Sequence, residues 1–156
     1  MMKSKPGKLI LIPCTLGDTE LNKVLPQENT TYINICSEFI VENIRSARRF
    51  LIKSNINTAI EDLKFHLLNK HTQEYELSAM LKSIEYGKNI GLLSEAGCPG
   101  IADPGANIVK LAHSRGITVV PLVGPSSILM ALIASGLNGQ NFAFCGYLPK
   151  EKTERK

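Results

Sequence analysis

Short apolar runs alternate with segments of helical periodicity along most of this chain. Each run is too short for a typical helix and is rich in aliphatic or β-branched residues, which is typical of buried strands. The predicted strands cover residues 8–13, 31–35, 63–68, 89–93, 117–122 and 141–149. The run at 63–68 also fits a helix, because Ile60, Leu63 and Leu67 recur at helical spacing.

Apolar residues spaced three and four apart predict helices over residues 37–54, 73–88, 105–116 and 124–136. Ser37 is expected to cap the first helix, and Pro125 suits the start of the last. The later helices are expected to end at Gly87, Gly116 and Gly136. Strands that alternate with helices predict an α/β fold, in which a parallel sheet carries helices on both faces.

The same pattern divides the chain into three parts. Residues 1–122 are predicted to form an N-terminal αβ domain, and residues 123–140 a connecting helix and linker. Residues 141–156 are interpreted as the first strand and a charged end of a second αβ domain that lacks most of its residues. A chain of 156 residues suits one full domain with a real core but is short for two.

Composition narrows the class of protein. Apolar residues make up 44% of the chain and charged residues 21%, with a net charge of +4, so an anionic partner is permitted but not required. The longest apolar run, residues 128–134, is too short to cross a bilayer, and no membrane association is predicted. The 4 cysteines lie far apart, without metal-ligand spacing, which indicates reduced thiols, a cytoplasmic protein and no metal site.

Three loops rich in glycine and proline follow predicted strands. Their sequences are PCTLGDTE, SEAGCPGIADPG and VGPSS. In an open parallel sheet, ligands bind at the carboxyl ends of the strands, where glycine lets the backbone approach them closely. The dinucleotide motif G-x-G-x-x-G and the phosphate-binding loop are both absent, which favours an uncharged or zwitterionic ligand. The alternative is that these glycines only shape tight turns.

The order of motifs over residues 90–149 resembles the tetrapyrrole methylase superfamily, and most closely its branch containing ribosomal RNA small subunit methyltransferase I. That branch carries a D-A-G-x-P…D-P-G loop, a V-V-P-L-x-G-P strand and turn, and a G-F-L-P entry into a second domain. The chain has EAGCPGIADPG, VVPLVGP and GYLP at these places. It departs from the pattern at Glu95 and Cys98. It also departs in the loop after the first strand, and in the E-D-T-R element, of which only Glu42 and Arg45 are kept.

The resemblance implies an enzyme, a methyltransferase that uses S-adenosyl-L-methionine and forms a homodimer. RNA is the implied substrate, through 2'-O-methylation of ribosomal RNA and hence a role in rRNA processing; a tetrapyrrole is the alternative substrate. A different class of interpretation is a non-catalytic remnant that binds a ligand or partner but lacks the half that completes the site.

The resemblance also implies which residues contact the cofactor: Leu16, Ala96, Gly97, Cys98, Ile101, Ser126 and Ser127. A sulfonium methyl donor is already activated, so the protein supplies positioning rather than a metal or a nucleophile. Small residues let backbone atoms hold such a molecule, and a helix start with two serines suits a carboxylate or ribose.

Other residues have two interpretations each. Asp18 is the candidate catalytic or substrate-orienting acid, although it also suits a turn in which it bonds its own backbone. Cys98 is interpreted as a structural or cofactor-contacting residue, because no base is evident beside it. The cluster Arg45, Arg48 and Arg49 is either a solvated helix face or a contact for a phosphate backbone.

Overall fold

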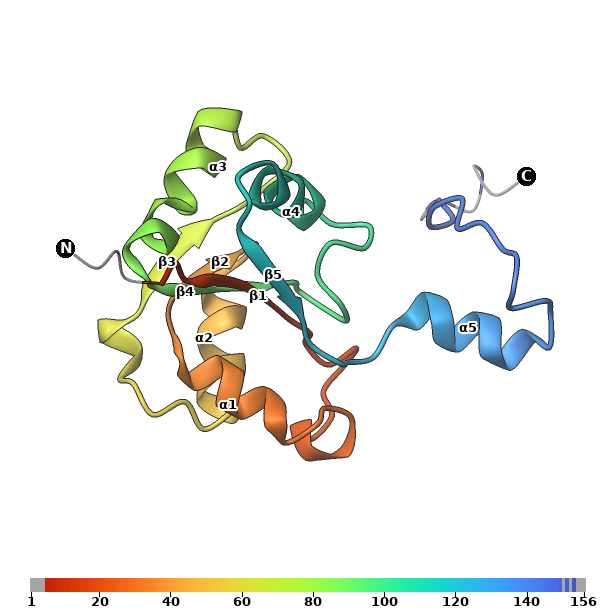
Figure 1. The fold of residues 1–156 in the computed structure, drawn as a ribbon. Coiled ribbons are helices and arrows are strands. Elements are labelled where there is room, and N and C mark those ends of the chain that lie inside the picture. Colours follow the sequence, from red (N-terminus) through yellow and green to blue (C-terminus); the bar gives the residue numbers. More distant parts are fainter. Residues whose placement is uncertain (1–4, 150, 152, 154–156) are drawn as a thin grey trace. The chain divides into compact units, whose positions relative to one another are not determined.

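The computed structural model describes residues 5–149, 151 and 153, and its chain divides into two compact units, Met1–Ser126 and Ser127–Lys156 (Figure 1). Most of the charged end of the chain, residues 150–156, lies outside the described residues. Among the described residues, no helix has the length and apolar character that crossing a bilayer would need.

The first unit is built on a five-stranded sheet in which every pairing is parallel. Its strand order is β3-β2-β4-β1-β5. The strands are β1 (Lys8–Ile12), β2 (Cys36–Val41), β3 (Lys64–Leu67), β4 (Asn89–Leu93) and β5 (Thr118–Pro121). This confirms the predicted α/β fold with a parallel sheet.

Helices cover both faces of this sheet (Figure 1). Helices α1 (Glu28–Asn34) and α2 (Ile44–Lys53) lie on one face, and α3 (Glu74–Met80) and α4 (Gly105–Ser114) on the other. Short 3₁₀ turns complete the connections: η1 (Leu21–Lys23), η2 (Ile60–Asp62) and η3 (Lys82–Tyr86). Successive residues of a strand therefore pack into different apolar layers. Leu9 packs in a layer with residues of α3 and α4, whereas Ile10 packs in a layer with residues of α1 and α2.

Two predicted elements near β2 were wrong. Residues 31–34 belong to α1 rather than to a strand, and the following residues form β2, where a helix capped by Ser37 was predicted. A strand buried on both faces has a continuous apolar run, so Phe39, Ile40 and Val41 resemble a buried helix segment. Helix α2 begins later, and the side chain of Asn43 accepts hydrogen bonds at its start.

The remaining elements of the first unit were predicted well. The runs at 8–13, 63–68, 89–93 and 117–122 all contain strands. The helix predicted at 73–88 is formed by α3 and η3 and ends at Gly87, whose φ of 83° is left-handed. Helix α4 is followed by Gly116 with a φ of 66°.

The second unit contains α5 (Ser127–Ser135), which is followed by Gly136 with a φ of 69°. The strand predicted over 141–149 is not formed: these residues carry no regular secondary structure. A strand is stabilised by hydrogen bonds to a neighbouring strand. No described residue of 141–149 has such a partner, so the apolar pattern alone does not form one.

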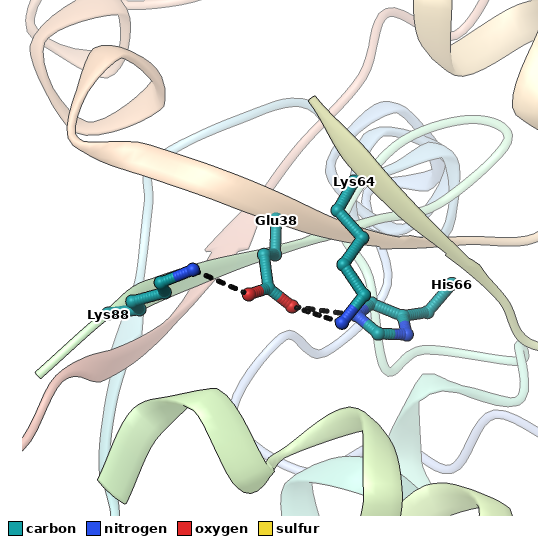
Figure 2. A network of polar contacts seen from close by, with 4 residues as sticks. All are labelled: Glu38, Lys64, His66 and Lys88. Carbon is teal, nitrogen blue, oxygen red and sulfur yellow. Dashed lines mark hydrogen bonds and ion pairs between the residues drawn. The ribbon is translucent and has the colours of Figure 1, made fainter. Parts of the chain in front are cut away.

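A buried carboxylate lies in β2 among three basic side chains (Figure 2). Glu38 is 2% exposed, and its Oε2 accepts a hydrogen bond of 2.9 Å from Nε2 of His66. Lys64 and Lys88 each place Nζ 3.4 Å from one of its carboxylate oxygens. Lys64 and His66 belong to β3 and Lys88 directly precedes β4, so the network links β2 to both of its neighbours in the sheet.

Candidate functional site

A cavity of about 460 Å³ lies where β1, β2 and β4 end. Its walls are the loop after β1, the residues that follow β2 and β4, and one side of α2. The connections from β1 and β2 lead to helices on one face of the sheet, whereas β4 leads to α4 on the other (Figure 1). The cavity therefore lies at a switch point in the topology, where open α/β sheets bind ligands.

Hydrogen bonds join the loops after β1, β4 and β5. The amide of Cys14 donates to the carbonyl of Gly97 at 2.9 Å, and the amide of Gly97 donates back to Cys14 at 3.2 Å. The thiol of Cys98 lies 3.4 Å from the carbonyl oxygen of Pro125, to which it donates. Three loops that are far apart in the sequence thus lie together along one edge of the sheet, at the carboxyl ends of the strands.

The two thiols of this edge are held in their neutral form. Burial, together with the charge of Glu95, raises the pKa of Cys14 to about 12, and burial raises the pKa of Cys98. A neutral thiol donates a weak hydrogen bond but is a poor nucleophile. The structure thus favours a structural or contact role for Cys98.

Gly97 occupies a restricted position of the edge. Its φ is 70°, in the left-handed region that glycine adopts without strain. A Cβ at this position would lie 3.2 Å from Cδ2 of Leu16 and 3.2 Å from the carbonyl oxygen of Pro125. A side chain at this position would strain the backbone and would require Leu16 or Pro125 to shift by a few tenths of an ångström.

Asp103 shapes the rest of the loop between β4 and α4. Its carboxylate accepts hydrogen bonds from the amides of Gly100, at 2.9 Å, and Gly105, at 2.7 Å. Burial raises its pKa, although those two amides oppose the shift. The sequence interpretation gave Asp103 no role, yet an Asp directly before Pro-Gly at a helix start was a usable signal.

Glu42 lines the cavity and has an unusual environment. Burial raises its pKa, and the negative charges of Asp103 and Glu95 raise it further. Glu95 itself accepts a hydrogen bond of 2.6 Å from the hydroxyl of Ser46. A carboxyl with a raised pKa keeps its proton to a higher pH than an exposed carboxyl does.

The predicted contact residues are partly brought together. Leu16 and Ala96 line the cavity, and Gly97 and Cys98 belong to the joined edge. Ile101 lies farther along the loop and is 48% exposed. Ser126 ends the first unit and Ser127 begins α5 in the second.

Asp18, the candidate catalytic acid, lies at the rim of the cavity. Its side chain is 95% exposed and its Oδ1 is 3.1 Å from Nζ of Lys53. Within the described part of the chain, no group of three or more His, Cys, Asp or Glu side chains is arranged to hold a metal ion.

Comparison with known proteins gives related sequences over nearly the whole chain. A protein named ribosomal RNA small subunit methyltransferase I from Bacillus subtilis is 36% identical over 99% of this chain and 50% of its own length. Proteins of the same name from Vibrio cholerae and Escherichia coli O157:H7 are 36% identical over 74% of the chain and 29% identical over 96% of it. The chain spans about half the length of the curated relatives that it matches along its whole length. No family model matches.

Proposed function

Because this chain belongs to the tetrapyrrole methylase superfamily, in the branch of ribosomal RNA small subunit methyltransferase I, we propose a matching function. We propose that the chain is an αβ domain of an S-adenosyl-L-methionine-dependent RNA methyltransferase. Ribosomal RNA is the proposed substrate, and 2'-O-methylation, as a step of rRNA processing, the proposed reaction. The cytoplasm is the proposed location.

The observation that carries this proposal is the edge formed by three loops. A Cβ at Gly97 would lie close to Leu16 and to the carbonyl oxygen of Pro125. The loops after β1 and β4, two of the three, also line the cavity. Backbone carbonyls and small side chains dominate this edge, which suits a zwitterionic nucleoside better than a polyphosphate. The residues of this edge therefore fit the cofactor that the family uses.

In the proposed site, the cofactor supplies a methyl group that is already activated by its sulfonium. The residues that would hold it are Leu16, Ala96, Gly97, Cys98, Ile101, Ser126 and Ser127. Their task is to fix the donor in one orientation, which lowers the entropic part of the barrier to transfer. Asp18 is the proposed catalytic or substrate-orienting acid at the rim, where the acceptor would enter.

The proposed domain boundaries are residues 1–122, 123–140 and 141–156, for the N-terminal domain, the connecting segment and the start of a second domain. We also propose that the chain forms a homodimer. The support is α5, where seven consecutive residues from Ile128 to Ala134 are apolar and leave no polar face. A helix of this kind is usually covered on several sides.

Isothermal titration with S-adenosylhomocysteine tests the proposed function. We expect saturable heat with one site per chain. The absence of heat at millimolar ligand would reject cofactor binding by this chain and favour a non-catalytic remnant.

A further inference from the structure

The outward side of α2 carries a row of cations. Arg45, Arg49 and Lys53 recur at every fourth residue, so they lie along one side of the helix at intervals of about 6 Å. Arg48 stands next to this row, and α2 contains no acidic residue. We call these four residues the α2 basic row.

The charges of the α2 basic row are available to a partner. All four residues are exposed, and among the described residues no carboxylate lies within ion-pair distance of the three arginines. Lys53 pairs with Asp18, whose side chain is itself almost fully in solvent. The guanidinium of Arg48 lies 5.4 Å from the centre of the Phe65 ring, which limits its movement.

The α2 basic row reaches the proposed site. Arg49 and Lys53 line the same cavity as Leu16 and Ala96, and Ser46 of the same helix lines it too. A ligand bound along this helix therefore passes the mouth of the cavity. Several cations spaced along a line suit a chain of phosphates, whereas a single phosphate would use only one or two of them.

We propose that the α2 basic row binds the phosphate backbone of an RNA strand and directs it toward the cavity between the loops after β1 and β4. This rests on the proposed function, and it assigns the substrate contact to particular residues. Arginine suits the task, because its guanidinium binds phosphate oxygens in pairs.

The test measures binding of a fluorescein-labelled single-stranded RNA of mixed sequence to the full chain by fluorescence anisotropy over a range of KCl concentrations. The variant is Arg45→Gln/Arg49→Gln. The matched control is Lys82→Gln/Lys110→Gln, which removes the same charge from exposed residues of η3 and α4, on the other face of the sheet.

We expect the arginine variant to raise Kd by about tenfold or more and to reduce the slope of log K against log salt by about 1 to 2. The lysine control should stay within about twofold of the wild type, as expected for residues outside the contact. Equal weakening by both variants would show that net charge alone attracts RNA, and would overturn the proposal. So would a wild-type chain that binds no RNA.

A parallel titration with S-adenosylhomocysteine separates this proposal from the one on which it rests. If the wild type binds that ligand but the arginine variant binds RNA normally, the proposed role of the α2 basic row in RNA binding is wrong, and the proposed function stands. If the arginine variant alone loses RNA and no chain binds the cofactor product, RNA binding stands and the methyltransferase proposal fails.

Discussion

At the scale of single residues, Glu38 is a buried carboxylate surrounded by basic side chains. Burial alone would raise its pKa, but hydrogen bonds from His66 and Ser83 and the charge of Lys64 outweigh burial and lower it from 4.5 to about 2. The folded protein therefore holds this carboxylate ionised at pH values where the unfolded chain would protonate it. That difference makes the free energy of unfolding depend on pH.

We expect Glu38→Gln to destabilise the protein by about 2 kcal/mol at pH 7, because it leaves the basic side chains without their shared partner. The stabilisation from Glu38 is fully present above about pH 4.5 and is lost as the pH falls toward 2, since its folded pKa is depressed. Urea unfolding at pH 7 and pH 3 measures this. The difference between wild type and variant should shrink at pH 3.

Glu61→Gln is the control for that experiment, because Glu61 is an exposed carboxylate in η2. It should change stability by less than about 0.5 kcal/mol at both pH values. A gap between wild type and Glu38→Gln that stays constant with pH would contradict the assigned ionisation.

At the scale of elements, sequence periodicity predicted a segment correctly where its length or its flanking residues distinguished a strand from a helix. The run before Ser94 is short and follows Gly87, so its assignment as β4 was secure. Around β2, an apolar strand runs almost directly into α2, and both contribute to one continuous pattern. The pairing of β2 with β3 and β4 fixes these residues as a strand in the folded protein.

Helix α2 provides a direct check of that boundary. Asn43→Ala should lower the free energy of unfolding by about 1 kcal/mol, because the amides of Arg45 and Ser46 lose the side-chain oxygen that they bind. Ser37→Ala, which removes the cap predicted from the sequence, lies on an exposed position of β2 and should have little effect. Urea denaturation measures both. Equal losses from the two substitutions would argue against the observed start of α2.

The candidate site was predicted in composition but not in geometry. The glycines and prolines predicted that three loops gather at the carboxyl ends of the strands, and hydrogen bonds do join these loops. The motif resemblance indicated Gly97 and Cys98 as cofactor contacts, which stays a prediction. The exchange of hydrogen bonds between Cys14 and Gly97 could not be inferred, because it joins residues far apart in the chain. The environments of Glu42 and Asp103 depend on that same tertiary arrangement.

At the scale of the whole molecule, the chain matches relatives about twice its length, and its two units differ in character. The first has two apolar layers around a sheet, whereas α5 has apolar residues and no buried position. We expect the chain to self-associate through such apolar surface. Light scattering at micromolar concentration should give the mass of a dimer. A mass equal to one chain would contradict the proposed homodimer.

We propose that the loops after β1, β4 and β5 form a cofactor-binding edge that requires glycine at position 97. Isothermal titration with S-adenosylhomocysteine tests it on the wild type, on Gly97→Ala and on Gly100→Ala. Both substitutions place a Cβ on a left-handed backbone, at a cost of about 1 to 2 kcal/mol, but only at position 97 would the added atom meet Leu16 and Pro125. At position 100 no atom lies within 4 Å.

We expect saturable heat for the wild type and for Gly100→Ala. Gly97→Ala should bind more weakly by about tenfold or more, because displaced loops misplace the ligand. A wild type that gives no heat at millimolar ligand, or a folded Gly97→Ala that binds as tightly as the wild type, would contradict this proposal.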